Sequence, residues 1–149
     1  MITTQSFASG TGIPWVNAGR GIRVGAYLID LVPALFMGLL GIIPFIGPIL
    51  AGLLLTPYWL LRDVMGGSFG KVLLGLRVVG KDGRPATKGA LVARNLPLII
   101  GPAMMVIPLL GYVFGPGAAF VCILIEAISL LATGERLGDK IAGTVVVKR

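Results

Sequence analysis

The chain has 149 residues, of which 56% are hydrophobic and only 13% are charged, and its mean hydropathy is +0.95. A soluble domain of this size averages about a quarter charged residues, so the composition excludes a soluble globular protein and predicts a multi-pass membrane protein. The net charge of +7 does not indicate nucleic-acid binding, because the sequence has no basic patch interleaved with aromatic residues.

Residues 1–21 are polar and glycine-rich, and we expect them to form a loose N-terminal segment. They lack a basic start followed by an apolar core, so no cleavable signal peptide is predicted. The rest of the chain, 22–149, is expected to form a single membrane domain.

Four apolar runs predict four transmembrane helices. The runs lie in stretches nearly free of charge, and one crossing of a bilayer needs about 20 apolar residues. The expected limits are about 22–42, 46–63, 92–112 and 116–133. We therefore predict an all-α membrane protein whose four transmembrane helices form two hairpins.

After each hairpin we expect the same cytoplasmic element, which has a glycine-rich turn, a short amphipathic helix and a strand. The short helices are predicted at about 68–75 and 135–142, and the β-branched strands are "LRVV" (76–79) and "TVVV" (144–147). The two strands could pair as a small sheet under the bundle. A cytoplasmic connector at 80–88 joins the halves and begins with the tight turn that "GKDGRP" predicts.

The two halves of the domain, 22–79 and 89–147, resemble each other. "GAYLIDLVP" in the first half aligns with "GALVARNLP" in the second, and "GGSFGKVLLGLRVV" aligns with "GERLGDKIAGTVVV". Both halves run in the same direction through the membrane. We therefore predict a parallel repeat, whose copies are related by a pseudo-two-fold axis along the membrane normal.

The lysines and arginines lie mainly in the terminal segments and in the loop between the two hairpins. Two lysines or arginines precede the first apolar run, seven lie between the hairpins and four close the chain, whereas the turns "GIIPFIGP" and "LLGYVFGPG" carry none. By the positive-inside rule, both termini and the central loop are expected to be cytoplasmic. Anionic lipid headgroups are the partner that this charge predicts.

The repeat places three pairs of polar side chains at equal depth. The pairs are Asp30 with Arg94, Lys71 with Asp139, and Tyr58 with Glu126. An unpaired charge at depth costs at least about 2.5 kcal/mol on insertion scales, so we expect an ion pair between Asp30 and Arg94. It would be either a gating pair in a transport path or a salt bridge that fixes helix register. Lys71 and Asp139 are expected to latch the two amphipathic helices together.

Glu126 lies near the middle of its predicted helix, and no basic residue matches its depth. It is either a proton or cation site or a neutral carboxyl bonded to Tyr58 or to a backbone carbonyl that a proline leaves free. Arg23 is expected to reach the interface or to brace the cytoplasmic loop. The chain has no histidine and one cysteine, Cys122, so we expect no disulfide, metal site, cofactor or enzymatic activity.

The segments "RVGAYLID", "GGSFGKVLLGLRVV", "ARNL" and "GDKIAGTVVV" resemble the RDD family of bacterial membrane proteins, which is named for an arginine and two aspartates. Carried over by motif, these residues are Arg23, Asp30 and Asp139, and Arg94 fits the arginine that opens the family's third helix. The family often has histidine where this chain has Gly138. The resemblance implies the bacterial inner membrane and transport of ions or small ligands, with cation/proton exchange proposed for some members.

Two classes of function remain open. The first is a small ion or ligand transporter, which with four helices would need to oligomerise to enclose a path. The second is a non-catalytic subunit or assembly factor that packs against larger membrane partners. In either case the expected partners are the lipid bilayer and either further copies of the chain or a larger membrane complex.

Overall fold

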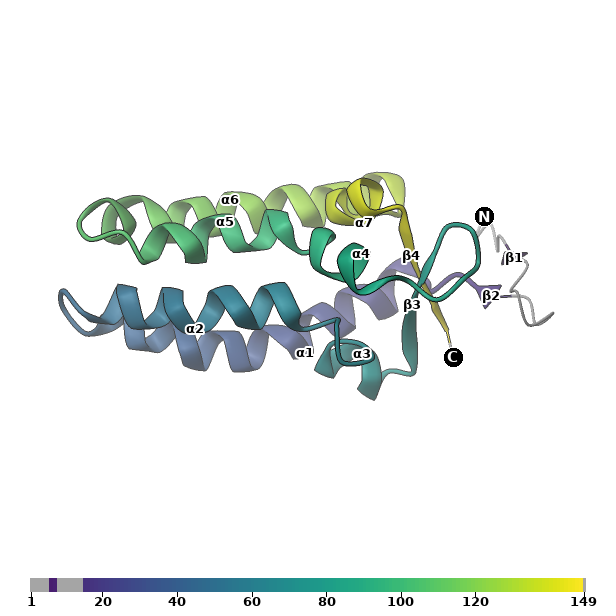
Figure 1. Ribbon diagram of the computed structural model, residues 1–149, viewed down its shortest axis with the longest axis horizontal. Helices are drawn as coiled ribbons and strands as arrows, with labels where there is room; N and C mark the ends of the chain where they lie inside the picture. Colours follow the sequence, from purple (N-terminus) through teal and green to yellow (C-terminus); the bar gives the residue numbers. More distant parts are fainter. Residues whose placement is uncertain (1–5, 8–14, 149) are drawn as a thin grey trace.

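The computed structural model describes residues 6–7 and 15–148. In the described part of the chain, four helices run side by side as a bundle, and three short helices and two small two-stranded sheets lie toward one end of it (Figure 1). Strand β2 (Trp15–Val16) and strand β4 (Thr144–Lys148) lie at this same end, which we call the sheet end.

The first hairpin agrees closely with its expected limits. Helix α1 (Arg20–Leu39) continues as a 3-10 turn (Leu40–Ile42), and helix α2 (Gly47–Leu61) returns beside it. The turn between the two helices contains Phe45, whose φ is +65°. The apolar runs therefore predict both helices to within a few residues.

The second hairpin differs from the expected helices at 92–112 and 116–133. It consists of helix α4 (Lys88–Ala93), helix α5 (Leu96–Met105) and helix α6 (Leu110–Thr133). The predicted limits are wrong because Pro116, the expected start of the fourth helix, lies inside α6, which begins at Leu110 and includes the expected turn at 113–115. The expected third helix is divided between Ala93 and Leu96, and Pro97 lies in the first turn of α5.

The predicted strand pairing is confirmed. Strand β3 (Leu76–Gly80) pairs antiparallel with β4, and Val78 lies opposite Val146. Leu76 and Val146 are fully or almost fully buried in a cluster with Ala26 of α1, so the sheet packs directly against the end of the bundle. The short helices α3 (Phe69–Leu73) and α7 (Leu137–Ala142) precede the two strands.

The N-terminal segment joins this sheet. Strand β1 (Ser6–Phe7) pairs with β2, Asn17 bridges Val147, and the Ala18 N–H donates to the Val146 carbonyl at 3.0 Å. Of the segment expected to be loose, 1–5 and 8–14 lie outside the described residues, and 15–18 are ordered by these backbone contacts with β4.

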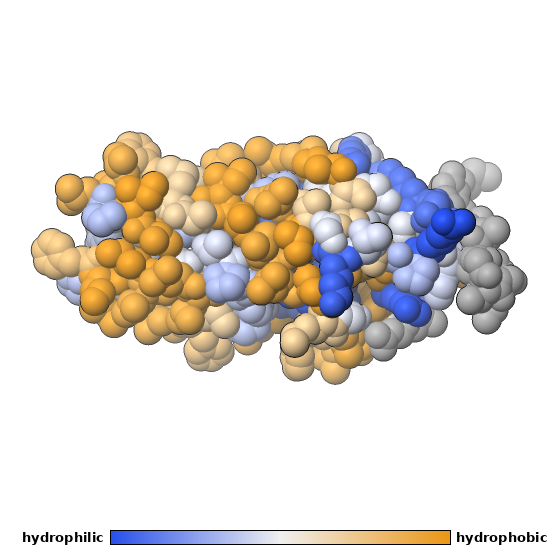
Figure 2. All heavy atoms as spheres, viewed as in Figure 1, coloured by the Kyte–Doolittle hydropathy of each residue, from blue (hydrophilic) through white to orange (hydrophobic). Residues whose placement is uncertain are grey.

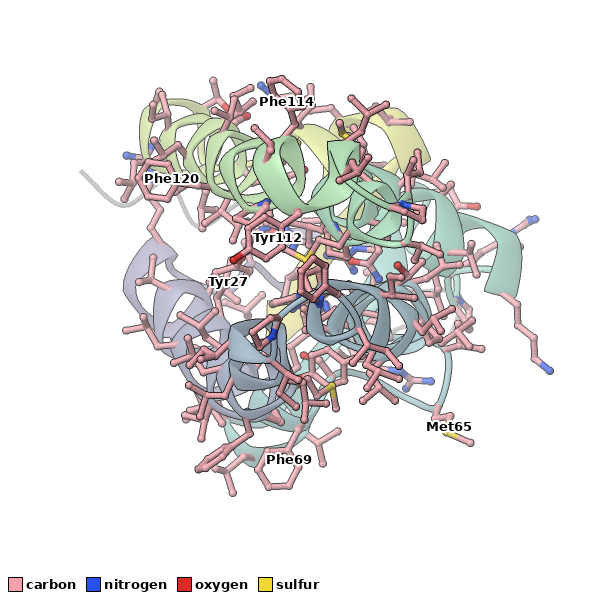
Figure 3. The ribbon with its side chains drawn as sticks, turned by 90° about the vertical axis from the view of Figure 1, so that its left-hand side faces the viewer. Tyr27, Met65, Phe69, Tyr112, Phe114 and Phe120 are labelled. Atoms are coloured by element: carbon pink, nitrogen blue, oxygen red, sulfur yellow. The ribbon has the colours of Figure 1, made fainter. Side chains whose placement is uncertain are left out.

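The surface separates into an apolar bundle and a polar end. Figure 2 shows apolar residues covering the helices and charged residues gathered at the sheet end. Phe69, Phe114 and Phe120 point away from the bundle in different directions (Figure 3), and all three are more than half exposed. Among the described residues, two helices are long and apolar enough to cross a membrane, Arg20–Ile42 and Leu110–Thr133, and two shorter apolar helices lie beside them.

Candidate functional site

Among the described residues, nine charged side chains are buried together at the sheet end of the bundle, and we call them the charge cluster. Its members are Arg23, Asp30, Arg62, Asp63, Lys71, Arg94, Glu126, Arg136 and Asp139. None of these side chains is more than 8% exposed. Burying an unpaired charge raises the free energy of the folded state, so the stability of the domain depends on the contacts within the cluster.

Asp139 on α7 is bound by three guanidinium groups. Arg94 donates to its Oδ1 at 2.5 Å, Arg136 donates to the same oxygen at 3.4 Å, and Arg23 donates to its Oδ2. Burial raises the pKa of the Asp139 carboxyl, but the three guanidinium groups outweigh burial and hold this pKa well below its ordinary value. Asp139 is therefore ionised and joins α1, α7 and the α4–α5 junction.

Asp63 follows α2 and accepts hydrogen bonds from the start of α3 and from the α4–α5 junction. Its partners are Lys71, the Ser68 N–H at 3.1 Å and the Asn95 side-chain amide at 3.2 Å, and the Arg94 Nε lies 3.7 Å away. Burial raises the pKa of Asp63, but Lys71 and Arg94 outweigh it and keep this pKa well below its ordinary value. Asp63 links the first hairpin to the second through Arg94 and Asn95.

The carboxylates of Asp30 and Glu126 each accept a hydrogen bond from the backbone N–H of a glycine in a short helix. The Gly70 N–H of α3 donates to Asp30 at 2.7 Å, and the Gly138 N–H of α7 donates to Glu126 Oε1 at 3.0 Å. Carboxylates are favoured at such helix N-termini because the first N–H groups have no partner within the helix. Each short helix is therefore fastened to a long helix by a buried carboxyl.

Glycine is required where these short helices approach the bundle. A Cβ atom at Gly70 would lie 2.0 Å from the Ala26 carbonyl oxygen, and one at Gly138 would lie 1.8 Å from the Arg94 carbonyl oxygen. Both distances are far inside van der Waals contact with backbone atoms that cannot move aside. Gly138 thus permits α7 to reach Glu126 and Asp139 to reach Arg94.

All three residue pairs predicted from the repeat are wrong. Asp30 pairs with Arg62 at 3.3 Å rather than with Arg94, and Lys71 pairs with Asp63 rather than with Asp139. The Tyr58 hydroxyl donates to the backbone carbonyl of Asp30 at 2.6 Å rather than to Glu126. Equal depth in a repeat does not imply that two side chains face each other, and here the partners come from the loops and short helices after each hairpin.

Arg23 braces the segment after α6. It donates to the Gly134 carbonyl at 2.6 Å as well as to Asp139, and its side chain is 7% exposed. This contact joins α1 to the segment between α6 and α7.

Three members of the charge cluster were missed by the sequence analysis. They are Arg62, Asp63 and Arg136. The chain has only six acidic residues, and Asp63 stands beside Arg62 immediately after an apolar run. An adjacent pair of opposite charges at the end of a predicted membrane helix was the signal that could have identified Asp63.

A cavity of about 180 Å³ opens between α1 and α6 beside the charge cluster. Its charged lining residues are Arg23, Asp30, Arg62, Lys71, Glu126 and Arg136, and Tyr27 contributes a ring. Arg62 stacks over Trp59, with its guanidinium carbon 4.6 Å from the ring centroid, and lies 5.6 Å from the Tyr27 ring centroid. The walls of the cavity are almost entirely apolar, because the charged ends of its lining residues are paired within the charge cluster.

The family comparison covers the whole site. The RDD family matches residues 17–143, a range that contains every member of the charge cluster. Neither a curated protein nor a solved structure matches the chain.

Proposed function

The chain belongs to the RDD family, and from this membership and the charge cluster we propose a four-span protein of the bacterial cytoplasmic membrane that binds and transports a small ion or ligand. The observation that carries the proposal is the charge cluster itself, in which nine charged side chains are buried at one end of an apolar bundle. Intramembrane and near-membrane charges of this kind line the paths of transported ions and protons.

The four-span topology rests on helix length and charge. Helices α1 and α6 are long enough to cross the bilayer alone, whereas α2 and α5, with 15 and 10 residues, extend about 22 Å and 15 Å at 1.5 Å per residue. Helices α4 and α5 together form the first arm of the second hairpin. The turns at the far end carry no lysine or arginine, so the sheet end is the cytoplasmic side in this proposal.

The order of elements supports two parallel copies. Each half contains a long-helix hairpin, a short helix and a strand in the same order. Gly70 and Gly138 occupy equivalent places in the aligned halves, and each lies against a backbone carbonyl of the bundle. We propose that the two halves superpose by a rotation near 180° about the membrane normal.

Within one chain, a transported ion would have to pass from the cavity to the far end of the bundle along an apolar surface. A groove of about 330 Å³ continues along α1 and α6, and its lining residues in the described structure include Ala34, Leu35, Trp59, Leu98 and Ile123 but no charged side chain. Transport therefore requires either a second copy that adds polar groups or a movement of α1 relative to α6. A homo-oligomer is the simpler arrangement.

The same groove favours a second candidate function. A non-catalytic subunit or assembly factor needs no polar path, and the exposed apolar faces of α1 and α6 offer large surfaces to partner helices. Such a subunit would use the charge cluster only to fix its own fold.

Ion and pH flux in proteoliposomes that contain only this protein tests the proposal. We expect flux from the unmodified chain, loss of flux in Arg62→Gln, and unchanged flux in Arg84→Gln, which removes an exposed arginine of the connector. Both variants are first checked for a monodisperse elution profile. Absence of flux under every ion gradient would overturn the transporter proposal and leave the subunit.

A further inference from the structure

The turn between α1 and α2, residues 43–47, contains a strained γ-turn. The Ile46 N–H donates to the Pro44 carbonyl at 2.8 Å, so this hydrogen bond closes over a single residue, Phe45. The φ of Phe45, +65°, lies in the left-handed region that bulky residues rarely adopt. Its side chain is 90% exposed, so contacts within the described chain do little to offset this strain.

The turn between α5 and α6, residues 107–111, repeats this structure 64 residues later in the chain. The Leu110 N–H donates to the Pro108 carbonyl at 2.7 Å, and Leu109 between them has a φ of +62° and a ψ of −61°. These angles are close to those of the rare classic γ-turn. Leu109 is 83% exposed. Each hairpin therefore ends in a strained turn that exposes one large apolar side chain, and we call Phe45 and Leu109 the tip residues.

A glycine after each tip residue closes its turn tightly. The Gly47 N–H donates to the Ile43 carbonyl at 3.0 Å, and the Gly111 N–H donates to the Ile107 carbonyl at 2.8 Å. A Cβ atom at Gly47 or Gly111 would lie 2.2 Å or 2.1 Å from a backbone carbonyl oxygen. In these two described turns, only the tip residues have a backbone N–H without a partner. Such turns satisfy nearly all of their backbone N–H groups internally, which is required where water is absent.

The far end of the bundle offers water almost no polar group. Residues 40–48 and 104–111 contain no charged or polar side chain, and no strongly hydrophilic residue lies at this end on the face drawn in Figure 2. A space of about 620 Å³ lies between the two turns, and the side chains that line it are apolar except for Tyr112. Tyr112 points between the hairpins (Figure 3). These apolar walls favour acyl chains over water.

The apolar surface of the bundle is about as long as the hydrocarbon core of a bilayer. Exposed apolar side chains follow α6 from Leu110 to Leu131, a rise of about 32 Å at 1.5 Å per residue. The hydrocarbon core is about 30 Å thick, and the headgroups extend the bilayer to about 40–45 Å. The polar surface of the sheet end begins just after Leu131, where Glu135 pairs with Lys81. With this boundary at the cytoplasmic interface, the far turns reach only the opposite edge of the hydrocarbon.

We propose that the tip residues insert into the lipid of the far leaflet, at the level where acyl chains join the headgroups, and that neither turn projects into water. Acyl chains favour the exposed side chains of Phe45 and Leu109, which water opposes. Ester carbonyls at this level accept from the tip N–H groups, which hydrocarbon alone does not satisfy. The inference rests on the membrane topology of the proposed function, and it holds for a transporter and for a subunit alike.

The test measures the depth of a nitroxide label in the full chain, reconstituted in vesicles of phosphatidylcholine and phosphatidylglycerol. In a Cys122→Ala background, the label is attached to Phe45→Cys or to Leu109→Cys. The controls are Leu35→Cys, at a position of α1 that is 59% exposed, and Arg84→Cys, at an exposed position of the connector. Electron paramagnetic resonance gives the collision rate of each label with oxygen, which concentrates in hydrocarbon, and with a water-soluble nickel chelate.

We expect both tip labels to collide more with oxygen than with the nickel chelate, as the label at Leu35 does, and the label at Arg84 to show the reverse. The tip labels should be shallower than the label at Leu35. Tip labels that behave like the label at Arg84 would overturn this inference and leave the membrane topology standing. If the label at Leu35 also behaves like that at Arg84, the bundle is not in the bilayer, and the proposed function fails as well.

A second measurement uses unlabelled variants and depends on the sign of the effect. Asparagine adopts positive φ more readily than phenylalanine or leucine, so in water Phe45→Asn and Leu109→Asn would relieve strain and remove an exposed apolar side chain. In lipid the amide replaces a favourable apolar contact. We therefore expect both variants to melt at a lower temperature than the unmodified chain in lipid nanodiscs. Phe45→Leu, which copies the second turn, is the matched control and should be unchanged. A higher melting temperature in both asparagine variants would overturn the proposal.

Discussion

Arg94 and Asp139 are 45 residues apart in the chain, and their side chains are joined at 2.5 Å with neither exposed to solvent. Arg94 also lies 3.7 Å from Asp63, which accepts from Lys71. A single guanidinium therefore contacts one carboxylate from each half of the domain. This arrangement couples α7, the α4–α5 junction and the end of α2, so the two hairpins are held together at the sheet end by charge as well as by the sheet.

Removing the Asp139 charge should destabilise the domain strongly. Asp139→Asn removes the carboxylate that Arg23, Arg94 and Arg136 share. Arg94 keeps only Asp63 at 3.7 Å and Arg136 keeps only Glu126 at 4.0 Å, and breaking a buried ion pair costs about 3–5 kcal/mol. The measurement is the free energy of unfolding in detergent micelles. The control is Glu135→Gln, which removes a partly exposed pair with Lys81 at 2.8 Å and should cost less than about 1 kcal/mol. Equal losses in the two variants would contradict the role of Asp139.

Stability should fall on acidification through the same carboxylates. The pKa values of Asp63 and Asp139 are held below their ordinary value in the folded state, so folding favours their ionised forms. The stabilisation is complete above the unfolded-state pKa of about 3.9 and is lost as the pH falls toward the lower folded-state values. Melting temperatures between pH 3 and pH 8 should be nearly constant above about pH 5 and decrease below it. Asp139→Asn should flatten the acidic part of the profile, and a decrease centred near neutral pH would contradict the assignment.

Because α7 lies against the backbone at Arg94, we expect a side chain added at Gly138 to destabilise the domain. Gly138→Ala places a methyl group against the Arg94 carbonyl and must displace α7, at a cost of about 1–3 kcal/mol. Gly117→Ala, in the interior of α6 with nothing within 4 Å, should be neutral or slightly stabilising because alanine favours helix. Thermal unfolding of the two variants in the same detergent distinguishes them. A Gly138→Ala protein as stable as Gly117→Ala would show that α7 is free to move.

Helices and strands were more predictable than the pairing of charges. The apolar runs predict α1 and α2 because helix limits follow from local composition, and the β-branched strands predict the β3–β4 pair. Composition does not specify whether a proline lies in the first turn of a helix, as Pro97 does in α5, or inside the helix, as Pro116 does in α6. The ion pairs depend on the rotation of each helix about its axis and on where short helices dock, and neither is encoded in the depth of a residue.

The last prediction separates the structural contact of Glu126 from a role in transport. Its Oε1 accepts from the Gly138 N–H, and the amide oxygen of glutamine can accept the same hydrogen bond. Glu126→Gln should therefore keep α7 docked and the protein folded, whereas Glu126→Ala should lose about 1–3 kcal/mol by leaving the buried N–H unpaired. A carboxyl that exchanges a proton or cation during transport cannot be replaced by an amide, so Glu126→Gln should also abolish pH-dependent flux in proteoliposomes. If Glu126→Gln matches the unmodified chain in flux, Glu126 acts only as the cap of α7.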